Sequence, residues 1–145
     1  MMDVPAANAL PDPWTGAASQ PPYPWRGHIT CDPAPGRPGS PDATPAAAAQ
    51  VASFFAAGAN SSLPTTFRDF ILHYANLCAS AGGVDAFLLG SELVALTRVR
   101  SASGVYPSAQ AIASLAGDVK AILGPATKVS YAADWTEYGA HVLSG

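Results

Sequence analysis

The stretch VDAFLLG at residues 84–90, followed by SEL at residues 91–93, decides the fold predicted for this chain. Its short apolar run is typical of a strand buried on both faces, as strands of parallel sheets are. Glu92 then places a carboxylate just beyond the carboxyl end of that strand. Because α/β barrels gather their catalytic residues at this end of their strands, Glu92 is the first candidate functional residue.

Helical patterns surround this strand, and a second strand follows it. The sequence KVSYAA at residues 128–133 predicts the second strand, which leads into DWTEY at residues 134–138. Capping residues, apolar spacing and glycine stops predict three helices. We expect them to begin at Pro45 after Thr44, near Thr66 and near Ser108, and to end at Gly58, Gly82-Gly83 and Gly124-Pro125.

Strands that alternate with helices predict right-handed crossovers and a parallel sheet. Residues 1–4 could supply the end of one more strand. Two or three strands cannot close an eight-stranded barrel. We therefore expect an α/β fold in which residues 1–145 are a piece of one larger domain.

Prolines are concentrated in the first third of the chain: 11 of the 14 lie at or before Pro45. Residues 4–44 therefore cannot hold a regular helix or a central strand. Such a long loop is uncommon in a compact domain unless it is functional. Because it carries Trp14, Tyr23 and Trp25, we expect it to be an ordered excursion that packs on the scaffold.

Composition excludes several classes of function. The net charge of −3 gives no basic surface for nucleic acid, and no apolar run reaches the ~18 residues of a membrane span. The amino-terminal residues show no secretory signal, and Cys31 and Cys78 are expected to be free thiols. The chain lacks nucleotide-binding, serine-hydrolase and zinc motifs, so we expect no cofactor and no metal.

Glu92 allows two interpretations. As a general acid it would need a pKa raised by partial burial and a position beside a scissile bond. Alternatively it caps the next turn or pairs with Arg98 or Arg100. Asp3 ends the expected first strand and is a second carboxylate at the same rim. The distance between Asp3 and Glu92 would separate a retaining from an inverting glycosidase.

The second strand also ends in carboxylates, among aromatic residues. Aromatic faces stack on sugar rings while carboxylates bind hydroxyl groups, so this arrangement suits a sugar site. The alternatives are a solvated loop whose tryptophan plugs the rim, or a cation held by oxygen ligands. The candidate binding residues are Tyr131, Asp134, Trp135, Glu137 and Tyr138.

Four long motifs together resemble one family along the whole chain: MMDVPAANALPDP (1–13), YPWRGHITCDPAPG (23–36), FLLGSEL (87–93) and VSYAADWTEY (129–138). They are similar to the TIM-barrel-like domain of the large tail-hub, or host-specificity, protein of gene transfer agents and related tailed phages. The resemblance implies a (β/α)8 barrel similar to glycoside hydrolases. Residues 1–145 would then be a partial TIM barrel from the end of strand three through strand five, with residues 4–44 as a long βα loop.

In the barrel glycosidases that this family resembles, the acid/base glutamate ends strand four, and Glu92 matches that position. The residue before it is commonly Asn there, whereas this chain has Ser91. The nucleophile would end strand seven, beyond Gly145. The resemblance therefore implies that this chain alone is inactive.

The residues and the resemblance leave three interpretations of function. The first is a tail-hub component of a phage-like particle, made in the bacterial cytoplasm, which contacts other tail or baseplate proteins and the host surface. The second is a hydrolase that cleaves cell-envelope polysaccharide with Glu92 as general acid/base; a carbohydrate-binding barrel without catalysis is a third reading. An arginine bound to Glu92 would favour the first, and an open cleft beside Tyr131 or Trp135 the others.

Overall fold

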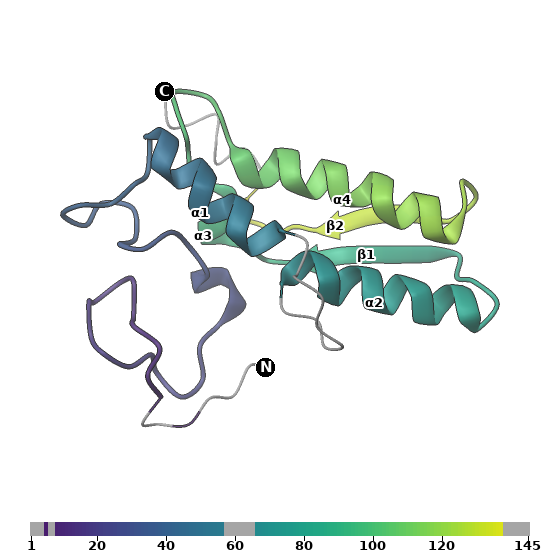
Figure 1. Ribbon diagram of the computed structural model, residues 1–145, viewed down its shortest axis with the longest axis horizontal. Helices are drawn as coiled ribbons and strands as arrows, with labels where there is room; N and C mark the ends of the chain where they lie inside the picture. The colour runs from purple at the N-terminus through teal and green to yellow at the C-terminus, as the bar shows by residue number, and fades with distance from the viewer. Residues whose placement is uncertain (1–4, 6–7, 57–65, 138–145) are drawn as a thin grey trace.

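The computed structural model describes residues 5, 8–56 and 66–137, and within them two parallel strands form the sheet. Strand β1 spans Ala86–Ser91 and strand β2 spans Lys128–Ala132. Leu88 pairs with Ser130 in a parallel register, so both strands point the same way (Figure 1). The predicted parallel sheet is confirmed for these two strands. The carboxyl ends that carry the candidate residues therefore lie at one edge.

Three longer helices pack around the strands, and their ends follow local chemistry. Helix α1 spans Pro45–Phe55, α2 spans Phe67–Ser80 and α4 spans Pro107–Leu123. Thr66 caps α2, because its side chain accepts a hydrogen bond from the Asp69 N–H. Thr44 precedes α1 but does not cap it, since its hydroxyl donates to the Pro41 carbonyl. The predicted end of the first helix at Gly58 lies outside the described residues.

Two short helices were not predicted from the sequence. Helix α3 spans Val94–Thr97, directly after β1, and the 3-10 helix η1 spans Arg26–His28 within the proline-rich loop. Both are about one turn long, too short for periodicity to reveal them. They matter because η1 and α3 lie at the carboxyl end of β1.

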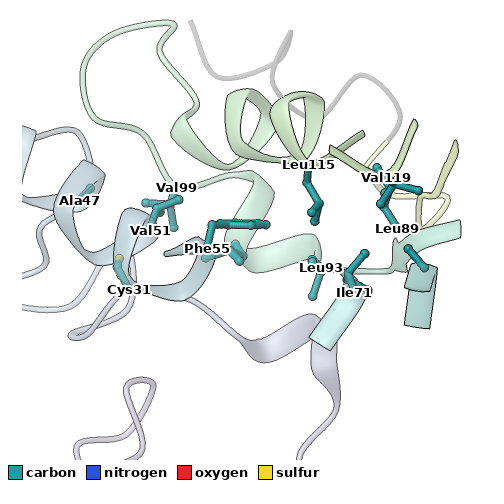
Figure 2. Packing of buried hydrophobic residues seen from close by; sticks show 12 residues of the cluster. Cys31, Ala47, Val51, Phe55, Ile71, Leu89, Leu93, Val99, Leu115 and Val119 are labelled. Atoms are coloured by element: carbon teal, nitrogen blue, oxygen red, sulfur yellow. The ribbon is translucent and has the colours of Figure 1, made fainter. Parts of the chain in front are cut away.

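One hydrophobic cluster joins the elements (Figure 2). It draws Val51 from α1, Ile71 from α2, Leu89 from β1 and Leu115 and Val119 from α4, all nearly inaccessible to solvent. Helices α2 and α4 thus cover the same face of the sheet. That face fixes β1 on the helices and holds its carboxyl end in place.

The expectation that β1 is buried on both faces is wrong for the described part of the chain. Leu89 is 3% exposed, but its neighbour Leu88 is 58% exposed. Side chains alternate across a strand, so Leu89 faces the helices while Leu88 lies on the opposite face, with Ser130 of β2 beside it. The apolar run therefore predicted the strand correctly. It did not predict that Leu88 on the second face is exposed in the described part of the chain.

The proline-rich loop is ordered over residues 8–44 and lies at the carboxyl ends of the strands (Figure 1). Its own hydrogen bonds hold it, because the Trp14 indole donates to the His28 carbonyl and Arg37 donates to the Trp14 carbonyl. Asp42 fastens its far end by accepting from both the backbone and the guanidinium of Arg100. The loop thus reaches the rim as a fixed structure.

Across the described residues, no helix has both the length and the apolar character needed to cross a membrane.

Candidate functional site at the carboxyl ends of the strands

Glu92 lies at an irregular point of the sheet. The register shifts between Leu88 and Ser91, where β1 contains one residue more than β2. Glu92 itself adopts a left-handed backbone with φ of 53°, which is strained for a residue with a side chain. Its N–H still donates to the Ala132 carbonyl at 2.9 Å. The bulge and the turn together aim the carboxylate away from the ladder, as bulges beside functional sites do.

The carboxylate of Glu92 binds the proline-rich loop. Arg26 Nη2 lies 2.6 Å from Glu92 Oε2, and Arg26 Nε donates to the Ser91 carbonyl at 3.0 Å. The Trp25 indole N–H also reaches Glu92 Oε2, at 3.4 Å. The expected partners Arg98 and Arg100 are therefore wrong: Arg98 donates to the Thr136 carbonyl and Arg100 binds Asp42.

This ion pair changes what Glu92 can do. Arg26 occupies Glu92 Oε2, an oxygen that a general acid would have to present to the substrate. Both side chains remain accessible, at 42% for Arg26 and 37% for Glu92. An incoming sugar would therefore have to compete with Arg26 for the carboxylate.

Glu137 is the centre of a second network, five residues beyond the end of β2 at Ala132. The hydroxyl groups of Thr97 and Tyr131 donate to its Oε1 at 2.7 and 2.9 Å, and the Asp134 N–H donates to Oε2 at 2.6 Å. Tyr131 in turn accepts from the Leu93 N–H at 2.6 Å. Glu137 thus joins the ends of both strands to α3.

The Tyr131 hydroxyl is held in its neutral form. Partial burial is the main cause that raises its pKa well above the ordinary value, and the hydrogen bond and charge of Glu137 raise it further. The Leu93 N–H opposes this shift. Tyr131 therefore acts as a hydrogen-bond donor at the rim and not as a base.

Asp134 and Glu137 close a tight turn that displays Trp135. The Glu137 N–H donates to the Asp134 carbonyl, and both the N–H and the hydroxyl of Thr136 donate to Asp134 Oδ1. These Thr136 hydrogen bonds lower the pKa of Asp134. Trp135 is 86% exposed at the tip of the turn. The alternative in which Trp135 plugs the rim is not supported by the described residues, whereas the alternative of a solvated turn agrees with its exposure.

The rim therefore combines a fixed turn, an exposed indole and two carboxylates already bound by the protein's own donors. Such a surface can stack on a ring or bury an apolar group. In the described part of the chain, no group of three or more His, Cys, Asp and Glu side chains could hold a metal ion. The candidates Asp3 and Tyr138 lie outside the described residues.

Beside Glu92 lies an open, largely apolar cavity of about 850 Å³. It extends from Trp25 and Arg26 across Ser91 to Leu88 and to Phe70 of α2. Sequence reasoning missed both Arg26 and Trp25 as rim residues. The aromatic and basic cluster YPWR at residues 23–26 was the available signal, but no pattern could place it against Glu92.

Comparison with known families gives one match. Residues 65–145, more than half of the chain, match the family described as GTA TIM-barrel-like domain. The matched region contains β1, β2, Glu92 and Glu137. No curated protein matches the chain, and no solved structure does.

Proposed function

The chain belongs to the GTA TIM-barrel-like domain family, and from this premise we propose that it is a tail-hub component of a gene-transfer-agent or phage-like particle. In this role it contacts the host surface and other tail or baseplate proteins. The proposal includes its place in the particle tail after synthesis in the bacterial cytoplasm. We also propose that residues 1–145 are part of one barrel domain, in which β1 and β2 are strands four and five.

The ion pair between Arg26 and Glu92 is the observation that carries this proposal. A carboxylate bound to a guanidinium supports recognition over proton transfer, since its charge is already compensated. The exposed Trp135 on its fixed turn supports the same reading, because tryptophan is enriched at binding interfaces. We propose that this contact surface binds an envelope glycan through Trp135, with Tyr131, Asp134 and Glu137 shaping the rim.

The particle role is tested in the producing bacterium. An epitope-tagged chain should co-purify with particles whose DNA resists nuclease, and antibody labelling should place it at the tail. A Trp135→Ala variant should still assemble but adsorb less to host cells, while Trp135→Phe should adsorb normally. A tagged chain that remains wholly outside purified particles would exclude the tail-hub role.

The second candidate function is hydrolysis of cell-envelope polysaccharide, with Glu92 as general acid/base. Its support is the position of Glu92: the carboxylate follows a bulge and a strained turn at the end of β1, beside an open cavity. Bulges and strained backbone conformations of this kind recur at catalytic sites. In this version Arg26 must leave Glu92 when substrate arrives.

Release of reducing ends from purified envelope polysaccharide, measured with the full-length domain that would include the nucleophile, distinguishes the two functions. If Glu92 donates the proton, Glu92→Gln should abolish release and Glu92→Asp should retain a small fraction. Arg26→Gln should increase release, because it frees the carboxylate. Equal release by the full-length domain and its Glu92→Gln variant would remove the acid role, and a lack of release by the full-length domain with intact adsorption would favour the tail-hub role.

A further inference from the structure

A second hollow lies within the proline-rich loop, apart from the exposed turn at Trp135. Its volume is about 350 Å³. Its lining combines aromatic and hydrogen-bonding side chains, namely Asp12, Trp14, Gln20, Trp25, His28 and Thr30. These six residues take no part in the described hydrogen bonds of Glu137 and Asp134. Among them, Trp25 also contacts Glu92 at the end of β1.

Three rings are fixed around this hollow. The His28 ring lies 5.8 Å from Trp14 and 5.5 Å from Trp25, measured between centroids, and both pairs are steeply inclined. The two indole N–H groups are already used, by the His28 carbonyl and by Glu92. The tryptophans are 38% and 43% exposed, so ring surface remains accessible. What they offer to a ligand is therefore π surface.

The backbone holds both tryptophans in place before any ligand arrives. The Trp14 N–H donates to Asp12 Oδ1, and Arg37 donates to the Trp14 carbonyl. The Trp25 ring lies against Gly27, where a Cβ atom would come within 2.6 Å of three ring carbons. A preorganised aromatic site loses little side-chain entropy when it binds.

Polar groups complete the hollow. Hydrogen bonds from the Thr15 hydroxyl and the Trp14 N–H lower the pKa of Asp12, which keeps this carboxylate charged as an acceptor. The Gln20 amide uses one N–H on the Pro11 carbonyl. The Thr30 hydroxyl is buried and has no hydrogen-bond partner in the described structure. A buried hydroxyl without a partner is unfavourable, so a ligand that supplies the missing partner gains affinity.

We propose that this hollow binds a single neutral pyranose ring, stacked on Trp14 or Trp25 and hydrogen-bonded through its hydroxyl groups to Asp12, Gln20 and Thr30. The combination of π surface with acceptors and donors matches a sugar, which has apolar faces and a polar edge. A glycan bound here would run toward Glu92, because Trp25 touches both places. The choice of a sugar as the ligand rests on the proposed function, in which the chain contacts a glycan. The location of the site rests on the hollow itself.

The experiment titrates the full chain with methyl β-glucoside and with methyl N-acetyl-β-glucosaminide, and follows the three indole N–H signals by NMR. Phenylalanine variants assign the signals of Trp14, Trp25 and Trp135. We expect at least one of these sugars to bind saturably and shift the Trp14 and Trp25 signals. Trp14→Ala should weaken binding roughly tenfold, since it removes a stacking face. Tyr74→Ala is the matched control: it removes an exposed aromatic ring on α2 that does not line the hollow, so it should leave the affinity unchanged.

Thr30→Val provides a second test, which remains valid if the Trp14→Ala variant does not fold. It keeps the shape of the side chain, removes the buried hydroxyl and should weaken binding roughly fivefold while unfolding stability is kept or increased. A sugar response confined to Trp135 would overturn the loop site but support the rim. No response to either sugar, or a response of Trp14 and Trp25 to tetramethylammonium alone, would overturn the sugar assignment while leaving the particle role standing.

Discussion

Arg26 and Glu92 lie 66 residues apart in the chain, and a 2.6 Å ion pair joins them at the carboxyl end of β1. The same guanidinium donates to the Ser91 carbonyl, so one side chain binds the loop to both the backbone and the carboxylate of the strand end. This contact makes the proline-rich loop part of the rim. A ligand that reaches Glu92 must therefore also contact the loop or displace Arg26 from the carboxylate.

Arg26→Gln should loosen the loop with little loss of global stability. Exposed ion pairs contribute about 0–1 kcal/mol, and both partners here are more than a third exposed. We expect a small decrease in the free energy of unfolding by urea but faster proteolytic cleavage within residues 8–44. Arg68→Gln is the matched control, because it removes a similarly exposed ion pair with Asp118 on the helices. Equal cleavage of the loop in both variants would contradict this role of Arg26.

Leu88 and Leu89 provide a test of the sheet's two faces. Leu89 is buried under the helices, so Leu89→Ala should lower the free energy of unfolding by about 2–5 kcal/mol. Leu88→Ala should cost less than about 1 kcal/mol, because Leu88 is largely exposed. Denaturation of the two variants by urea measures both values. Comparable losses at the two positions would mean that the second face is covered in solution.

Tyr131 should make the fold sensitive to alkali. Burial, assisted by Glu137, raises its folded pKa above the unfolded value of about 10, so the neutral form favours the folded state. This contribution is fully present below pH ~10 and is lost as the pH rises through the folded pKa. Thermal melts across that range should show a smaller alkaline loss for Tyr131→Phe. A loss as large as that of the original chain would assign the effect to other groups.

Local patterns predicted the elements of this fold better than they predicted its rim. The strand at residues 84–90 and the helix after Thr66 follow from periodicity and capping, which depend on neighbours in sequence. The parallel direction followed from the alternation of strands and helices. These features are encoded within one element or in the order of consecutive elements, so the sequence alone could predict them.

The partners of Glu92 could not be predicted in the same way. Arg98 and Arg100 were expected because they are close in sequence, but they follow helix α3 and bind the Thr136 carbonyl and the Asp42 carboxylate instead. Arg26 reaches Glu92 only because the loop folds back over the strand end (Figure 1). Glu137 was expected to bind sugar, yet its oxygens accept from Thr97, Tyr131 and Asp134. Long-range contacts of this kind depend on tertiary packing.

Asp42 should make the far anchor of the loop sensitive to acid. Burial alone would raise the pKa of Asp42, but the hydrogen bonds and charge of Arg100 outweigh it and lower the folded pKa. A carboxyl group with a lowered folded pKa stabilises the fold above its unfolded pKa of about 4, and this stability is lost as the pH falls through the folded value.

Asp42→Asn should therefore lower stability at neutral pH, where it removes a charged hydrogen-bond pair worth about 1.5–3 kcal/mol, and should lose less additional stability below pH ~4. Urea denaturation at neutral and acidic pH measures both effects. Asp118→Asn is the matched control, since its ion pair with Arg68 does not hold the loop. Only Asp42→Asn should also speed proteolysis near residues 35–44. If the stability difference between Asp42→Asn and the original chain were the same at both pH values, the carboxylate of Asp42 would not be the acid-sensitive anchor.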